Sequence, residues 1–206
     1  MNFGSSLVEK AVEEFSRLPG IGKRTALRLV LHLLNQEEVE ATAFGEAIIK
    51  LRKDIKYCEQ CNNISDLDIC DICSDLHRDH SIVCVVEDIR DVMAIEHTQQ
   101  YRGVYHILGG IIDPMNGIGP GDLKINSLLA KFATNEIKEV ILALSSSMEG
   151  DTTSFYLYKK IEPHQVPVTI IARGIAVGDE LEFVDDVTLA RSIINRTPYE
   201  SVLTTK

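Results

Sequence analysis

The sequence has no apolar run long enough to cross a membrane. Its longest uninterrupted apolar runs, such as residues 140–144, are about five residues long, whereas a membrane-spanning helix needs roughly 20. The N-terminus lacks the basic region and apolar stretch of a secretory signal. No GxxxxGK[ST] loop is present either, because the glycines of residues 117–121 have a different spacing. We therefore expect a cytoplasmic protein that neither enters a membrane nor hydrolyses nucleotides.

Basic charge is scarce and unevenly distributed. The 206 residues carry 21 basic and 31 acidic residues, a formal net charge of −10, which opposes attraction to nucleic acid. Residues 1–56 hold nine basic and eight acidic residues, a net charge of +1, while residues 57–206 hold 12 and 23, a net charge of −11. A polyanion is therefore expected to meet the N-terminal segment. The composition is otherwise that of a folded protein of one or two domains.

The periodicity of apolar residues changes along the chain. It is helical in residues 8–18, 26–34 and about 37–55, so the first 56 residues are predicted to be entirely helical. Short β-branched strands are predicted at residues 82–86, 104–108, 140–144 and 168–172. Helices are predicted between and after them at about 89–96, 123–133, 152–161 and 185–194. Alternating strands and helices indicate an α/β domain with a mostly parallel sheet.

The five cysteines are an odd number, and cytosolic thiols are more often metal ligands or catalytic groups than disulfides. Two Cys-x-x-Cys pairs with eight residues between them comprise Cys58, Cys61, Cys70 and Cys73. They predict one tetrahedral Zn²⁺, which is structural because four thiolates leave no position open for water. Two redox pairs or an iron–sulfur cluster are the alternatives. Cys84 is expected in the core, and His77 and His80 as exposed loop residues.

A glycine-containing corner, LPGIGKR at residues 18–24, joins the first two predicted helices. Its glycines allow a sharp turn, and the unpaired N–H groups that begin the next helix favour an anion. Lys23 and Arg24 in the first turn of that helix are repelled by the positive end of the helix dipole. A bound phosphate would turn this repulsion into attraction. The pattern fits a helix-hairpin-helix that binds DNA without sequence preference, and a plain corner with solvated cations is the alternative. The candidate DNA-binding residues are Gly20, Gly22, Lys23, Arg24 and Arg28.

Acidic residues follow two of the predicted strands. Glu87 ends the first strand of the α/β domain, and Glu149 and Asp151 follow a later one. The carboxyl ends of parallel strands form the usual ligand crevice of such a sheet. These acids are therefore candidates for binding Mg²⁺ or a partner's basic surface, and solvated loop acids are the alternative.

Taken in order, these motifs closely resemble the bacterial RecR family over nearly the whole chain. The resemblance is carried by the corner, the four-cysteine pattern, the strand ending VVE, the run LGGIIDPMNGIGP at 108–120 and RGIAVGDELEFVD at 173–185. It implies an α+β multidomain protein. The implied parts are a helix-hairpin-helix domain (1–56), a four-cysteine zinc finger (57–80), an α/β Toprim domain (81–177) and a C-terminal oligomerisation element (178–206).

The resemblance implies a DNA repair and recombination mediator with one structural zinc per chain and no enzymatic activity. Proteins of this family act with RecO, and in some bacteria RecF, to load RecA onto single-stranded gaps coated by single-strand-binding protein. They assemble into ring-shaped tetramers with the hairpins lining the hole. Four weak basic patches would then bind one DNA together, and their combined affinity would overcome the repulsion between DNA and the net negative charge of the chain.

One departure from the Toprim pattern bears on activity. Toprim enzymes carry a Glu after the first strand, then an Asp-x-Asp pair followed by Glu, and the matching positions here are Glu87, Ser145, Ser147 and Glu149. Serine supplies no negative charge to attract Mg²⁺, so we expect a scaffold that does not cleave DNA. A Mg²⁺-dependent nuclease or topoisomerase of Toprim type is the second hypothesis. A zinc-knuckle adaptor that binds only protein is the third.

Overall fold

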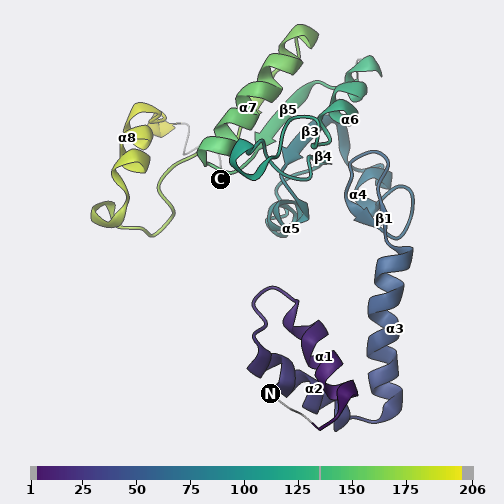
Figure 1. Ribbon diagram of the computed structural model, residues 1–206. Coiled ribbons are helices and arrows are strands. Elements are labelled where there is room, and N and C mark those ends of the chain that lie inside the picture. The colour runs from purple at the N-terminus through teal and green to yellow at the C-terminus, as the bar shows by residue number, and fades with distance from the viewer. Residues whose placement is uncertain (1–3, 135, 201–206) are drawn as a thin grey trace. The chain divides into compact units, whose positions relative to one another are not determined.

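The computed structural model describes residues 4–134 and 136–200. The chain divides into two compact units, Met1–Lys56 and Tyr57–Lys206. The first unit is helical, and the second contains a cysteine cluster and a parallel sheet, so the predicted fold class is confirmed (Figure 1). No helix among the described residues is both long and apolar enough to span a bilayer.

The first unit consists of α1 (Ser6–Ser16), α2 (Lys23–Leu34) and α3 (Glu38–Asp54). Helices α1 and α2 pack together through Val12, Ala26 and Val30, which are almost fully buried. Leu34, the last apolar residue of the predicted helical periodicity 26–34, is 63% exposed. Helix α3 contains no buried residue.

The second unit begins with a small finger. It is built from β1 (Lys56–Tyr57), β2 (Ile64–Ser65) and the short helix α4 (Asp71–Ser74), and the two strands pair with each other. Such short elements bury almost no apolar surface apart from the four cysteines, with Ile69 and Ile72 packed partly against them. The finger therefore cannot be held folded by a hydrophobic core and needs a cross-link such as a bound metal ion.

The parallel sheet has the strand order β4-β3-β5-β6. Its strands are β3 (Asp79–Val86), β4 (Gly103–Ile107), β5 (Glu139–Ala143) and β6 (Val168–Ile170). The connecting helices are α5 (Ile89–His97), α6 (Ile125–Ala130) and α7 (Met148–Ile161). Short 3-10 turns occupy Pro114–Asn116, Lys131–Thr134 and Glu162–His164.

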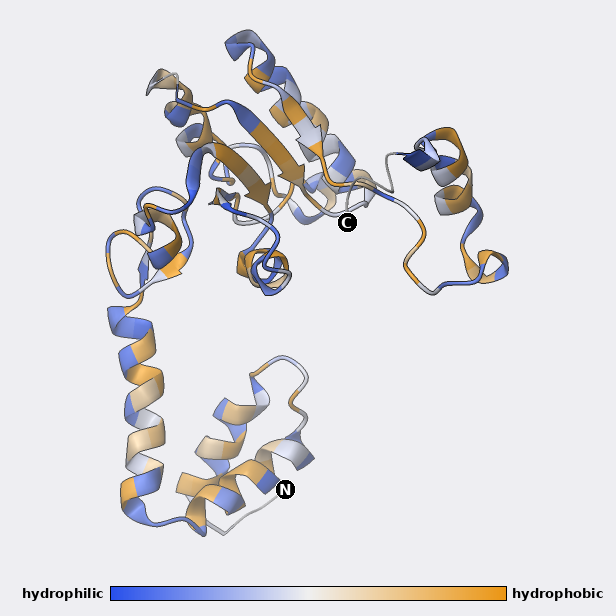
Figure 2. Ribbon diagram, turned by 180° about the vertical axis from the view of Figure 1, so that it is seen from behind, coloured by the Kyte–Doolittle hydropathy of each residue, from blue (hydrophilic) through white to orange (hydrophobic). Residues whose placement is uncertain are grey.

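Both faces of this sheet are covered. Alternate residues of a strand point to opposite faces, so Val83 and Val85 pack with α6 and α7, whereas Cys84 and Val86 pack with α5. The central part of the sheet is accordingly apolar (Figure 2), whereas β3 begins with the polar and partly exposed residues Asp79–Ser81. Cys84 is 3% exposed, which confirms its predicted place in the core.

Two local predictions need correction. Helix α7 begins at Met148 and not at residue 152, because the Ser147 hydroxyl caps it by accepting a hydrogen bond from the Gly150 N–H at 3.1 Å. Glu149 and Asp151 therefore lie in a helical turn and not in a loop. His80 is exposed as expected but belongs to the start of β3, while His77 is an exposed turn residue.

The chain after the sheet forms a 3-10 turn (Leu181–Phe183) and helix α8 (Asp186–Ile194), which the Asp185 carboxylate caps. Neither element contains a buried residue. Large apolar side chains such as Phe183 and Ile194 are 79% and 73% exposed. The C-terminal segment thus presents apolar surface without a core of its own.

One buried histidine predicts how stability depends on pH. His106 in β4 is fully buried, its Nε2 donates to the Lys124 carbonyl at 2.8 Å, and its Nδ1 has no hydrogen-bond partner among the described residues. Burial lowers its pKa from 6.5 to about 4. Because the unfolded chain binds the proton more readily, this residue stabilises the fold above pH 6.5, and the effect is lost as the pH falls towards 4.

Over that window the wild-type protein should lose about 3 kcal/mol of unfolding free energy through this residue. His106→Gln can still donate to the Lys124 carbonyl but does not titrate, so its stability should fall less over the same range. Urea unfolding of both proteins between about pH 4 and 7 measures the difference. Parallel pH profiles for the two proteins would contradict the assignment.

Candidate metal centre and nucleic-acid interface

The four predicted zinc ligands come together in the finger. Cys58, Cys61, Cys70 and Cys73 are all buried, and their sulfur atoms lie within 4.8 Å of one another. The Cys61 and Cys70 sulfurs are 3.5 Å apart, close to the roughly 3.8 Å edge of a tetrahedron with 2.3 Å zinc–sulfur bonds. The geometry and the thiol donor set therefore fit Zn²⁺, which would hold the finger folded and supply no catalysis.

The four thiols of the cluster affect one another's ionisation. The hydrogen bond from Cys73 lowers the pKa of the Cys61 thiol to about 5, whereas burial raises the pKa of Cys70 to about 11. One thiolate thus forms readily, and its charge opposes ionisation of its neighbours. The backbone N–H of Cys70 donates to the Cys58 sulfur at 3.3 Å, as expected for a metal-bound thiolate.

The finger is joined to the edge strand β4 of the sheet. The Ile107 N–H donates to the Cys61 carbonyl at 2.8 Å, and the Asn62 side-chain amide donates to the Ile107 carbonyl at 3.4 Å. Asn62 has a positive φ of 62°, the left-handed conformation that asparagine tolerates best after glycine. The finger thereby pairs with a strand edge that would otherwise be open.

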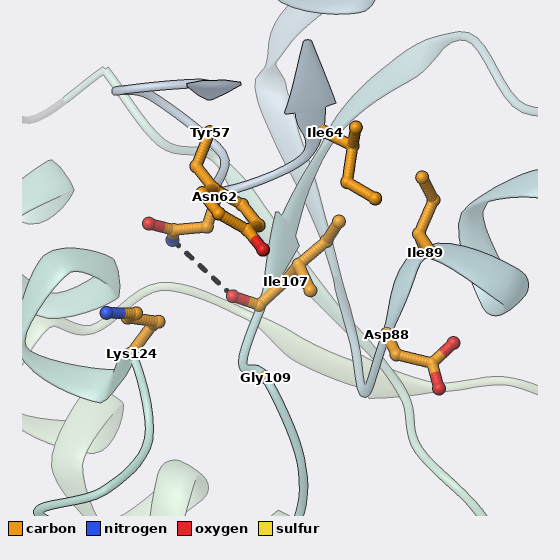
Figure 3. Close-up of a pocket in the computed structure, with 8 residues that line it drawn as sticks. All are labelled: Tyr57, Asn62, Ile64, Asp88, Ile89, Ile107, Gly109 and Lys124. Carbon is orange, nitrogen blue, oxygen red and sulfur yellow. Dashed lines mark hydrogen bonds between the residues drawn. The ribbon is translucent and has the colours of Figure 1, made fainter. Parts of the chain in front are cut away.

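A pocket of about 440 Å³ lies where the finger meets the sheet (Figure 3). Its lining is mainly apolar, and it consists of Tyr57, Asn62, Ile64, Asp88, Ile89, Ile107, Gly109 and Lys124. The Asp88 carboxylate is paired with the Arg90 guanidinium and caps α5. The size and apolar lining of the pocket suit an apolar group. The sequence did not predict the pocket, because its walls come from four segments that are separate in the chain.

The predicted DNA-binding residues lie at the corner between α1 and α2. Gly20 has a φ of +78°, which favours glycine, and no heavy atom lies within 4 Å of where a Cβ would sit. Gly22 precedes α2, so no side chain caps the helix, and its first turn contains no acidic residue. The first N–H groups of α2 are thus left for solvent or an anionic ligand.

The cations of this corner are available to a ligand. Lys23, Arg24 and Arg28 are exposed, and none of the ion pairs found in residues 4–134 and 136–200 involves them. Arg24 and Arg28 are four residues apart on α2 and line one shallow groove with Leu27, Leu31, His32 and Asn35. The structure therefore brings three cations and a helix N-terminus to one exposed corner.

The acidic candidates lie at the carboxyl edge of the sheet. Strands β3 and β5 are neighbours whose connections leave in opposite directions, which makes their ends the switch point where α/β sheets bind ligands. Glu87 follows β3, and Ser145 and Ser147 follow β5 with their hydroxyl oxygens 3.2 Å apart.

These acids do not form a metal-binding cluster. Within the described residues, the four cysteines are the one group of three or more potential ligands whose donor atoms lie within 4.8 Å of one another. Asp151 is paired with the Arg173 guanidinium at 2.7 Å, which lowers the pKa of its carboxyl group. Burial, followed by the neighbouring Asp91 and Asp88 carboxylates, raises the pKa of Glu87, and this outweighs the opposing effect of Arg90. Arg173 belongs to a motif recognised in the sequence, but its ion pair with Asp151 was not predicted.

The close packing behind this edge predicts a strongly destabilising substitution. A Cβ added to Gly150 would lie 2.0 Å from the Ser145 carbonyl oxygen, so Gly150→Ala must displace backbone. We expect a loss of about 1–3 kcal/mol or more in unfolding free energy. Gly121→Ala is the matched control, because no atom lies within 4 Å of its Cβ position. Chemical denaturation measures both, and equal stabilities would contradict the packing described.

Comparison with known proteins covers almost the entire chain. Four family models match: a RecR helix-hairpin-helix at residues 8–51, a RecR four-cysteine zinc finger domain at 55–75, a Toprim domain at 81–172 and a RecR C-terminal segment at 174–197. The finger match and the cysteine geometry together identify Cys58, Cys61, Cys70 and Cys73 as ligands of one structural zinc.

Individual relatives give the same result. The recombination protein RecR of Bacteroides thetaiotaomicron is 61% identical over 195 residues, which are 95% of each chain. That of Bacteroides fragilis is 59% identical over 197 residues, or 96% of each chain, and that of Flavobacterium johnsoniae is 57% identical over 200 residues, or 97% of each. The chain belongs to the RecR family of recombination proteins.

Proposed function

We propose that this recombination protein binds DNA non-specifically through the corner between α1 and α2. The observation that carries the proposal is the exposed set of Lys23, Arg24 and Arg28, which form no ion pair with any other described residue, beside a helix N-terminus without a side-chain cap. These groups match a phosphate backbone in charge and in hydrogen-bond donors. Phosphates carry no base identity, so sequence preference is not expected.

Self-association supports this function by multiplying the contacts. One corner on an acidic chain binds weakly, whereas several corners on one DNA raise the effective concentration of each later contact. The C-terminal element, residues 178–206, is proposed to join the subunits of a ring-shaped tetramer. The exposed apolar side chains of its described part, including Phe183 and Ile194, support that role.

The family points to the pathway in which this binding acts. We propose that the protein works in the cytoplasm with RecO, and in some bacteria with RecF, to promote RecA loading onto single-stranded gaps. Glu149 and Glu87 at the carboxyl edge of the sheet are proposed as contacts for a partner's basic surface, because they form no cation site among the described residues there. The pairing of Asp151 with Arg173 leaves it less available for such a contact.

The proposal is tested by RecA filament formation on single-stranded DNA coated with single-strand-binding protein. Addition of this protein together with RecO should shorten the delay before filaments form, and neither protein alone should do so equally. DNA affinity should be measured in parallel across a salt series, with and without RecO. No effect on RecA loading, together with no salt-dependent DNA binding, would favour an adaptor that binds only protein.

The nuclease hypothesis is less well supported. Ser145 and Ser147 stand where a Toprim enzyme has its paired aspartates, and no acidic cluster forms among the described residues of this edge. The relatives are named as recombination proteins and not as enzymes, in agreement with the expectation that this chain is not an enzyme. Incubation with supercoiled plasmid and Mg²⁺ decides the matter, because sustained nicking by pure protein would overturn the scaffold interpretation.

A further inference from the structure

A second pocket, of about 470 Å³, lies beside the cysteine cluster, and we call it the Lys131 pocket. The finger contributes the zinc ligand Cys73 to its wall. Helix α6 contributes Ser127, and the 3-10 turn after α6 contributes Lys131. All the residues that line it belong to the second unit. The pocket thus brings a lysine to the side of the metal site.

The packing of α6 turns Lys131 towards the finger. Leu128 and Phe132 are 0% and 4% exposed and belong to the core of the sheet. Ser127 and Lys131 are four residues apart, so they share a different face of these helical turns. Ser127 faces the finger, because its hydroxyl oxygen accepts a hydrogen bond from the Asn62 side-chain amide at 3.5 Å. Lys131 therefore lies on the same side.

The charge of Lys131 has no carboxylate partner among the described residues. Glu59 and Glu136 line the same pocket but form no ion pair with it. Burial lowers the pKa of Lys131, and the thiolates of the four cysteines oppose this effect, Cys73 most strongly. The sulfur atoms are therefore the anionic groups that act most strongly on this ammonium group.

A zinc-loaded cluster has a use for such a cation. Four thiolates outweigh the two positive charges of Zn²⁺, so the loaded site carries a net negative charge. Inside a protein this charge is costly unless hydrogen-bond donors or a cation balance it. The Cys70 N–H already donates to the Cys58 sulfur at 3.3 Å. On the side of Cys73, the Lys131 pocket supplies the cation.

We propose that the Lys131 ammonium group balances part of the negative charge of the zinc-loaded cluster on the side of Cys73 and thereby slows the release of zinc. Lys131 acts through the cysteines and is not itself a metal ligand. Groups that support metal ligands in this way typically raise the metal affinity of a site about 10–100-fold. Since Leu128 and Phe132 anchor this turn in the sheet, the sheet contributes to zinc retention in the finger.

The alternative is a lysine that only covers apolar surface with its stem. Val83 and Val104 also line the Lys131 pocket, so such packing is available. Charge and packing can be separated by substitution. Methionine keeps an apolar stem of similar length without the charge, whereas arginine keeps the charge on a head group of different shape.

The zinc affinity of the full-length protein tests the role of the charge. In competition with a chelator, Lys131→Met should bind zinc about 10–100-fold more weakly than the wild-type protein. Lys131→Arg should keep an affinity close to that of the wild type. Lys160→Met is the matched control, because it makes the same change at an exposed position of α7 outside the pocket, and it should leave the affinity unchanged.

Substitution of the zinc by Co²⁺ gives a readout that packing alone would not change. A positive charge near the sulfurs raises the energy needed to move an electron from sulfur to the metal. Without that charge, the sulfur-to-cobalt charge-transfer band of Lys131→Met should shift to longer wavelength, and Lys131→Arg should restore its position. The ligand-field bands should remain those of a tetrahedral site, since all four cysteines are kept.

The outcomes separate a charge effect from other causes. Unchanged zinc affinity and an unchanged charge-transfer band in Lys131→Met overturn the proposal. An equal loss of affinity in Lys131→Met and Lys131→Arg, with the band unmoved, indicates packing alone and also overturns it. A similar loss in Lys160→Met would assign the effect to net charge and not to this pocket. Weaker zinc binding with a shifted band in Lys131→Met, both restored in Lys131→Arg, supports the proposal.

Discussion

Replacing Cys61 by serine is expected to remove zinc from the protein and unfold the finger. A structural zinc site contributes about 10–16 kcal/mol of apparent binding free energy in small fingers, far more than the few apolar contacts of this one. Zinc should fall from about one ion per chain to nearly none. Because the Cys61 carbonyl accepts from Ile107, the edge strand β4 should also lose protection against hydrogen exchange.

Metal analysis of the purified variant and of the wild-type protein measures the effect. Cys84→Ala is the matched control, since Cys84 is buried in the sheet away from the cluster and its loss should leave the zinc content unchanged. Full zinc occupancy in Cys61→Ser would contradict the four-cysteine site. Iron in place of zinc in the wild-type protein would favour the iron–sulfur alternative.

Replacing both Lys23 and Arg24 by alanine should weaken DNA binding and flatten its salt dependence. Each lost phosphate contact reduces the slope of log affinity against log salt by about 0.9 on duplex DNA and about 0.7 on a single strand. The slope should therefore fall by about 1.4–1.8 for every corner that engages the DNA. At low salt we expect an affinity loss of about tenfold or more, which grows with the number of corners engaged.

Fluorescence anisotropy over a salt series measures both quantities. The matched control is Lys10→Ala/Arg17→Ala, which removes the same charge from exposed positions of α1 and its C-terminal end. If net charge alone mattered, both double variants would lose affinity equally, and the assignment of the corner would be wrong. Unchanged binding in Lys23→Ala/Arg24→Ala would also contradict it.

Much of the fold could be predicted from local pattern. Alternating strands and helices after residue 80 indicated the parallel sheet, because strands buried on both faces need continuous apolar runs. The start of α7 was not predicted correctly, because Ser147 caps the helix and a capping residue is not part of the apolar periodicity that predicts a helix. The exposure of Leu34 was not predictable, because an apolar residue near a helix end satisfies the helical pattern whether or not a neighbour covers it.

The candidate sites were predictable to different degrees. Cys-x-x-Cys spacing identifies a metal site because the ligands are local and the ion dictates their geometry. The corner itself was predictable for the same reason, since Gly20 and Lys23 lie within one turn of chain. Its role in DNA binding stays a prediction. The pairing of Asp151 with Arg173 was not, because 21 intervening residues separate them and only the folded chain brings them together.

The amino-acid sequence by itself determined the helical first unit, the four-thiol metal site, the α/β sheet and the lack of paired aspartates at its edge. These depend on residue type and short spacing, which act before the chain is folded. Tertiary structure alone decided that the finger closes the edge of β4 and that Asp151 is paired with Arg173. Those features depend on distances between segments remote in the chain, and a one-dimensional pattern contains no such distances.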